Sequence, residues 1–137
     1  MGNRMVLGRV LIVDDQLYVR QAVRLVLTKA GYDVIEAEDG AQGIQMMEEH
    51  QNASNVDTII CDLQMPNVDG EQTITYFKRH HPQIPLVILT GAPDFVLTEV
   101  LKNQGITDYL IKPVTDKRLL EVIRATVRLH ELRKKPT

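Results

Sequence analysis

The sequence predicts an α/β fold: a three-layer sandwich of five βα units, with a central parallel sheet between two layers of helices. Short continuous apolar runs recur along the chain, and such runs are typical of strands that are covered on both faces, as in a parallel sheet. Each run is followed by a longer segment with apolar residues at helical spacing. This alternation favours parallel strands joined by right-handed helical connections.

The elements follow one another without a gap large enough for a second domain. Strands are predicted at 10–13, 33–37, 58–62, 86–90 and 108–111, and the strand at 33–37 is expected to be a shorter strand at an edge of the sheet. Between and after them, helical spacing predicts helices over about 19–30, 40–51, 70–81, 95–104 and from 116 onward. Gly31 and Gly105 stand where a helix commonly ends at a left-handed glycine.

The length and composition fit one domain. A chain of 137 residues can bury a complete core, so we expect a single domain over 1–137, with a core of about 7–128. We expect 129–137 to extend the last helix and to form a basic tail. An apolar content of 44% and a charged content of 25% are ordinary for a globular domain.

The net charge and the cysteine content indicate which partners and which cellular compartment to expect. A net charge of −2 predicts neither direct nucleic-acid binding nor membrane binding. No apolar run reaches transmembrane length. One cysteine, Cys61, excludes an internal disulfide and fits a reducing compartment, so we expect a cytoplasmic protein in which Cys61 is a buried packing residue.

Polar side chains stand at the ends of the predicted strands. The first strand is followed by Asp14 and Asp15, the third ends in Asp62, the fourth in Thr90, and Lys112 follows the fifth. Because parallel strands end at the same edge of a sheet, we expect these side chains to meet there. Three carboxylates repel one another, and carboxylates without His or Cys favour Mg²⁺ over zinc or copper.

The same residues suit phosphoryl chemistry. A lysine can neutralise an anion and a threonine hydroxyl can donate a hydrogen bond to it. Of the three carboxylates, Asp62 lies on the central strand, and an aspartate can act as a nucleophile that forms an aspartyl phosphate. The sequence therefore predicts a phosphoryl-accepting site with Asp62 as its nucleophile.

Four motifs carry a resemblance to a known family. They are Val-Asp-Asp at 13–15, Asp-Leu-Gln-Met-Pro-Asn-Val-Asp-Gly at 62–70, Leu-Thr-Gly at 89–91 and Lys-Pro at 112–113. In this order and spacing the chain resembles, from about 7 to 127, the response-regulator receiver domain of two-component signalling, of the chemotaxis-receiver type. The resemblance implies a flavodoxin-like sheet of strand order 2-1-3-4-5.

The resemblance also implies a reaction and its ligands. Asp62 would accept a phosphoryl group from a sensor histidine kinase or a phosphotransfer protein. Asp15, Asp62 and the backbone carbonyl of Gln64 would bind Mg²⁺ directly, whereas Asp14 would act mostly through water. The protein would then be a signalling phosphoacceptor, which catalyses only its own phosphorylation and dephosphorylation.

A switch and an output face are implied in the same way. Thr90 and Lys112 would contact the phosphoryl oxygens, and Tyr109 would turn inward as Thr90 moves toward them. A tyrosine on a half-buried strand can also be static packing, so that alternative stays open. The bond before Pro113 would be cis. Output would pass through the fourth helix, fifth strand and fifth helix, to an output domain or a separate protein, with a homodimer as a further possible response to phosphorylation.

Two other function classes fit the fold. Phosphatases with an aspartyl nucleophile carry an Asp-x-Asp motif after the first strand, whereas Asp14 and Asp15 are adjacent here. A flavin-binding electron carrier is opposed by the acidic rim and by the aromatic content of 4%. We expect the four histidines to be surface or helix-end residues. A stripe of Val122, Ala125, Leu129 and Leu132 predicts a dimer contact or a signalling helix.

Overall fold

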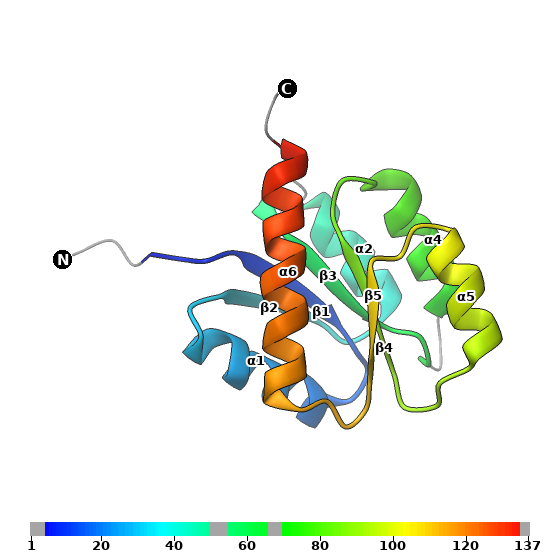
Figure 1. Cartoon of the computed structure of the whole chain (residues 1–137), viewed down its shortest axis with the longest axis horizontal. Coiled ribbons are helices and arrows are strands. Elements are labelled where there is room, and N and C mark those ends of the chain that lie inside the picture. Colours follow the sequence, from blue (N-terminus) through cyan, green and yellow to red (C-terminus); the bar gives the residue numbers. More distant parts are fainter. Residues whose placement is uncertain (1–4, 50–54, 66–69, 135–137) are drawn as a thin grey trace.

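Strands and helices alternate along the part of the chain that the computed structural model describes, which is residues 5–49, 55–65 and 70–134. The strands are β1 (Arg9–Val13), β2 (Asp33–Ala37), β3 (Thr58–Asp62), β4 (Leu86–Thr90) and β5 (Asp108–Ile111). The helices are α1 (Leu17–Lys29), α2 (Gly40–Glu48), α4 (Gly70–His80), α5 (Phe95–Asn103) and α6 (Asp116–Lys134) (Figure 1).

The strands form one parallel sheet of order β2-β1-β3-β4-β5. The predicted fold class and strand order are thus confirmed. The predicted glycine stops are also present, because Gly31 follows α1 with φ +104° and Gly105 follows α5 with φ +98°. The register pairs Val13 with Cys61 and Asp62 with Leu89, so β1, β3 and β4 end at one edge.

The core is divided by the sheet into two layers. In β1, Leu11 and Val13 pack against the side covered by α2, α4 and α5, whereas Val10 and Ile12 pack against α1 and α6. This alternation follows from the two-residue period of a strand, and it explains why a continuous apolar run is required. Cys61 is fully buried, and burial, followed by the charges of Asp62 and Asp14, raises the pKa of its thiol.

The last helix differs from the sequence prediction at two positions. His130 was predicted to be a surface or helix-end residue, but it is a buried residue of α6: only 3% of it is exposed, and its Nδ1 lies 2.9 Å from Asp57 Oδ1. Val122 was predicted to belong to an outer stripe, but it is a core residue that is 3% exposed. Both residues continue the buried face of α6, which also holds Ile123 and Val127 at helical spacing.

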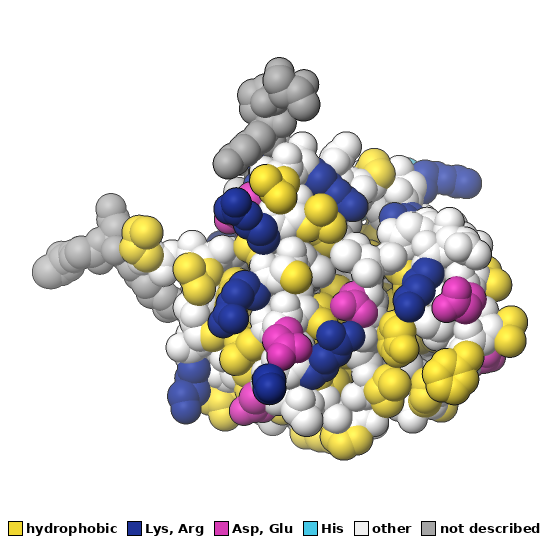
Figure 2. All heavy atoms as spheres, in the orientation of Figure 1, with side chains coloured by type: hydrophobic (Ala, Val, Ile, Leu, Met, Phe, Trp, Pro, Cys, Tyr) yellow, Lys and Arg dark blue, Asp and Glu magenta, His cyan; other side chains and the backbone are white. Residues whose placement is uncertain are grey.

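The predictions for two further histidines and for the exposed side of α6 have mixed outcomes. His80 is exposed and ends α4, as predicted, whereas His50 lies outside the described residues. The side of α6 seen in Figure 2 carries basic and acidic side chains close together. Leu132 is 51% exposed on this helix. Within the described ranges, no helix combines the length and the apolar character that a membrane span requires.

Candidate functional site

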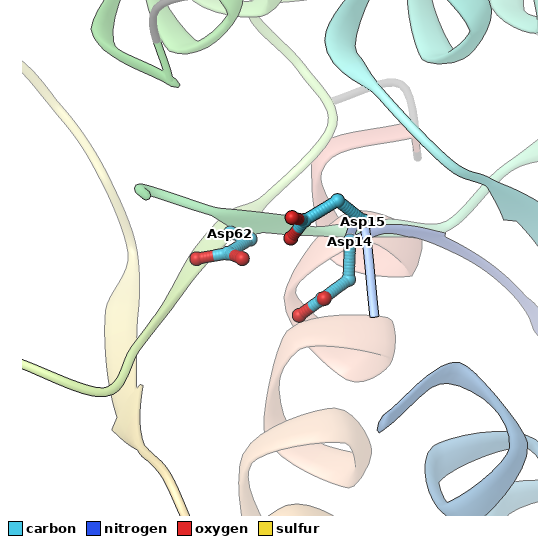
Figure 3. Close-up of side chains that lie close together, drawn as sticks. All are labelled: Asp14, Asp15 and Asp62. Atoms are coloured by element: carbon cyan, nitrogen blue, oxygen red, sulfur yellow. The ribbon is translucent and has the colours of Figure 1, made fainter. Parts of the chain in front are cut away.

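Three carboxylates meet at the edge where the central strands end. Asp14 and Asp15 follow β1, and Asp62 is the last residue of β3. One oxygen of each lies within 4.8 Å of the others, and Figure 3 shows the three side chains gathered at this edge. Asp15 is exposed, whereas Asp14 and Asp62 are buried. The sheet geometry therefore brings together the residues that the sequence placed at one edge.

Each buried carboxylate is oriented by the backbone that follows it. Asp14 Oδ1 accepts a hydrogen bond from the Gln16 N–H at 2.8 Å, and Asp62 Oδ1 accepts one from the Gln64 N–H at 2.9 Å. Aspartate commonly bonds the backbone two residues ahead in this way. One oxygen of each carboxylate is thus held by its own loop, which leaves the other free to face the site.

Lys112 lies against both of these second oxygens. Its Nζ is 2.9 Å from Asp14 Oδ2 and 3.2 Å from Asp62 Oδ2. It also donates a hydrogen bond of 2.9 Å to Gln16 Oε1. Burial opposes the charge of Lys112, but the two carboxylates outweigh that effect and raise the pKa of its ammonium group. The lysine therefore stays charged at neutral pH and offsets part of the repulsion between the carboxylates.

Asp62 is harder to ionise than an ordinary aspartate. Its pKa is raised from 3.8 to about 6, because burial, together with the neighbouring charge of Asp14, outweighs the opposing effects of the Gln64 N–H and of Lys112. A raised pKa shows that the negative charge on Asp62 is not fully compensated by the protein alone. The site is thus suited to gain a further cation.

We predict that, in the absence of divalent cations, the Asp62 carboxyl makes the protein less stable as the pH rises. The folded state binds the Asp62 proton more tightly than the unfolded chain does, because its pKa is about 6 when folded and 3.8 when unfolded. The free energy of unfolding should therefore fall between these two pH values, by as much as about 3 kcal/mol. Urea denaturation at a series of pH values, in the presence of a chelator, measures this change in the free energy of unfolding.

The control for this prediction is Asp62→Asn, which has no proton to lose at this position. Its stability should rise relative to that of the wild type as the pH passes from about 4 to about 7. An identical pH dependence of the two proteins would contradict the assignment of this pKa to Asp62.

Thr90 and the adjacent cleft complete the edge. Thr90 ends β4 and is 3% exposed. Its Oγ1 accepts a hydrogen bond from the Ala92 N–H at 3.2 Å, which leaves the hydroxyl proton available for another acceptor. Next to it, a cleft of about 430 Å³ is lined by residues that include Asp15, Asp62 and Lys112. The cleft is open to solvent and large enough for a phosphoryl group.

The remaining predicted residues surround this edge. Tyr109 on β5 is partly buried, packs against the core under α2, α4 and α5, and has Lys102 Nζ 5.0 Å from its ring centre. The Lys112–Pro113 peptide bond is cis. Asp69, which belongs to the motif at 62–70, lies outside the described residues. Gly70 begins α4 and is buried.

Two residues in this region were missed by the sequence analysis. Gln16 contacts Lys112, and Arg20 on α1 donates a hydrogen bond of 2.6 Å to the Asp14 carbonyl and one of 3.1 Å to Glu36 Oε1. Arg20 is buried and fixes the backbone of the Asp14 corner to both α1 and β2. The sequence carried no signal for Gln16, because the helix was expected from about 19 and the N-cap position of Gln16 is known only from the structure.

The donor set fits a hard divalent cation. Carboxylate oxygens are the preferred ligands of Mg²⁺, and three lie within 4.8 Å of one another. Asp14 Oδ2 is buried and accepts no well-formed hydrogen bond from the described residues, although Lys112 Nζ lies nearby. A buried acceptor without a donor is expected to bind an ion or water. An acidic triad of this kind is typical of the Mg²⁺ site of receiver domains.

Comparison with known proteins shows the family to which the chain belongs. The family model described as "Response regulator receiver domain" matches residues 10–124. The chemotaxis protein CheY of Bacillus subtilis is 31% identical over 122 residues, which cover 87% of this chain and 97% of CheY. The receiver domain of a response regulator from Clostridium thermocellum superposes with a TM-score of 0.83 and 27% identity, over 91% of this chain and 98% of the other.

A longer relative shows the same domain within a larger protein. The autoinducer sensor kinase/phosphatase CqsS of Vibrio cholerae is 30% identical over 122 residues, which cover 87% of this chain but only 17% of CqsS. The chain thus spans a small part of this relative and nearly all of CheY. It belongs to the response regulator receiver domain family, CheY-like, and is a signalling phosphoacceptor of two-component signalling.

Proposed function

We propose that Asp62 is the phosphoacceptor and takes the phosphoryl group from a phosphohistidine of a sensor histidine kinase or phosphotransfer protein. The observation that carries the proposal is the contact of 3.2 Å between Asp62 Oδ2 and Lys112 Nζ, beside two further carboxylates. An Asp62 oxygen forms a bond to phosphorus while the phosphorus–nitrogen bond of the donor breaks. The electron pair of that bond returns to the imidazole nitrogen.

Mg²⁺ would be held by Asp15, Asp62 and the backbone carbonyl of Gln64, with Asp14 acting mostly through water. When bound, the ion supplies positive charge against the phosphoryl oxygens during transfer. The protein itself contributes the orientation of Asp62, through the Gln64 N–H, and the charge of Lys112. Both are in place before a donor arrives.

Lys112 and Thr90 are the residues that we assign to the phosphoryl oxygens. Lys112 brings a charged ammonium group, and Thr90 has a hydroxyl proton available for donation. Movement of Thr90 toward the phosphoryl group would open space behind it, into which Tyr109 can turn. This is a two-state element biased by a local change of charge. Static packing of Tyr109 is the alternative outcome.

The output face is assigned to α5, β5 and α6, which are the fourth helix, fifth strand and fifth helix of the sequence prediction. Phe95 is 72% exposed, Val96 77% and Ile111 42%, and Figure 2 shows apolar side chains on the side that carries α5. Apolar side chains exposed together favour protein contact. The partner would be an output domain, a separate protein or, upon phosphorylation, a second copy of the chain. The contact would take place in the cytoplasm, and residues 1–137 would not bind nucleic acid directly.

The test is labelling by a small phosphodonor. Wild-type protein incubated with acetyl phosphate and Mg²⁺ should gain one phosphoryl group on Asp62, as read by intact-mass and peptide mass spectrometry. Chelation of Mg²⁺ and the substitution Asp62→Asn should each abolish the gain. Labelling that persists in Asp62→Asn at the same rate would refute the assignment.

A further inference from the structure

The side chain of Gln16 does not cap α1, although Gln16 stands at the start of that helix. Gln16 is the N-cap residue of α1 but makes no capping hydrogen bond with its side chain. An N-cap side chain normally accepts a hydrogen bond from an N–H of the first turn. Asp39 does so for α2 and Asp94 does so for α5, each toward the residue three positions ahead.

Gln16 instead contacts Lys112, which is 96 residues away along the chain. Gln16 Oε1 accepts a hydrogen bond from Lys112 Nζ at 2.9 Å. An ammonium group can only donate hydrogen bonds, so the amide must turn its oxygen toward the lysine. Gln16 is therefore the neutral one of three partners around Nζ, and Asp14 and Asp62 are the two charged ones.

The neutral amide of Gln16 matters because one of the charged partners, Asp62, changes during the reaction. Once Asp62 is bonded to phosphorus, the negative charge lies on the phosphoryl oxygens, so Lys112 exchanges its contact with Asp62 Oδ2 for a contact with a phosphoryl oxygen. The amide of Gln16 undergoes no such change, and its backbone is fixed at the start of α1 by the hydrogen bond of its N–H to Asp14 Oδ1. Gln16 can therefore hold the ammonium group in the same place before and after transfer.

We propose that Gln16 is a positioning residue that holds Lys112 at the phosphoryl group throughout the phosphorylation of Asp62. This inference rests on the proposed role of Asp62 as phosphoacceptor. It also explains why a residue that caps poorly stands at the start of α1, because its side chain contacts Lys112 and not the N–H groups of the first turn. A local rule of helix formation is broken where the site requires it.

The test separates this role from a structural one with two substitutions. Gln16→Met keeps the length of the side chain but removes the acceptor. Gln16→Ser removes the reach to Lys112 but adds a good N-cap, so it should raise the urea midpoint. Gln21→Met is the matched control, because Gln21 lies exposed on the same helix. The measurements are the phosphorylation rate at saturating Mg²⁺ and acetyl phosphate, and the affinity for Mg²⁺.

We expect the phosphorylation rate to fall about tenfold in both Gln16 variants, since one hydrogen bond to a charged group is lost. Affinity for Mg²⁺ should stay within about twofold of that of the wild type, because Lys112 keeps both carboxylate partners. An unchanged rate in Gln16→Met and Gln16→Ser would overturn the inference. So would a loss of Mg²⁺ affinity in parallel with the rate, which would indicate a general distortion of the site.

A second measurement does not depend on phosphorylation. Lys112 should react faster with an amine-acetylating reagent in Gln16→Met than in the wild type or Gln21→Met, by about threefold or more, because one of its partners is gone. Peptide mass spectrometry reports this rate for Lys112 alone. Equal reactivity of Lys112 in all three proteins would overturn the inference. A wild-type protein that acetyl phosphate does not phosphorylate would instead count against the role of Asp62.

Discussion

Replacing Lys112 by methionine is expected to lower the phosphorylation rate of Asp62 by about a hundredfold or more, since a charged donor aimed at a developing anion contributes this much. It should also lower the free energy of unfolding at neutral pH by about 3 kcal/mol, because two buried carboxylates lose their partner. The contacts at stake are those of Nζ with Asp14 Oδ2 and Asp62 Oδ2. Labelling kinetics and urea denaturation measure the two effects.

The same substitution should strengthen the binding of Mg²⁺. Lys112 competes with a metal ion for the oxygens of Asp14 and Asp62, and its removal leaves those oxygens to the ion. Mg²⁺ should therefore restore much of the lost stability, as ligands of the folded state do. Lys117→Met is the control, because Lys117 is exposed on α6. Weaker Mg²⁺ binding in Lys112→Met would show that the lysine organises the carboxylates rather than competing for them.

Replacing Gly70 by alanine is expected to cost about 3 kcal/mol or more of stability, as backbone strain and overpacking do. A Cβ on Gly70 would lie 2.1 Å from the carbonyl oxygen of Leu63 and 2.6 Å from its carbonyl carbon. Backbone atoms cannot turn aside as the end of a side chain can. The start of α4 would have to move away from the end of β3.

Gly70→Ala should also slow phosphorylation, because Leu63 directly follows Asp62. Gly91→Ala is the matched control, since its Cβ would meet nothing closer than 3.9 Å. Urea denaturation and labelling by acetyl phosphate measure both variants. A Gly70→Ala protein as stable as Gly91→Ala would contradict the close packing of α4 on Leu63.

The fold could be predicted because its signals are local. A buried parallel strand needs a continuous apolar run, and the chain has such runs at the predicted places. The meeting of Asp14, Asp62 and Lys112 also followed from local information, because parallel strands end at one edge. The burial of Cys61 followed from its place inside an apolar run.

The contacts that were missed are tertiary contacts between distant segments. Gln16 and Lys112 stand 96 positions apart, and no pattern within either segment indicates the other. The burial of His130, which was predicted to be a surface or helix-end residue, could not be predicted, because its partner Asp57 lies 73 positions away. The clash at Gly70 depends on the path of the backbone at Leu63. Composition and spacing do not report the path of the backbone.

The pairing of His130 with Asp57 has a mechanical consequence. Asp57 immediately precedes β3, and Asp62 ends that strand, so a strand of about 17 Å joins the C-terminal part of α6 to Asp62. Asp57 Oδ2 also accepts a hydrogen bond of 2.9 Å from the Arg9 N–H, which links this end of β3 to β1. The C-terminal part of α6 is thereby held against the sheet. The direction of the helix at Lys134 is therefore set by the same strand that carries Asp62.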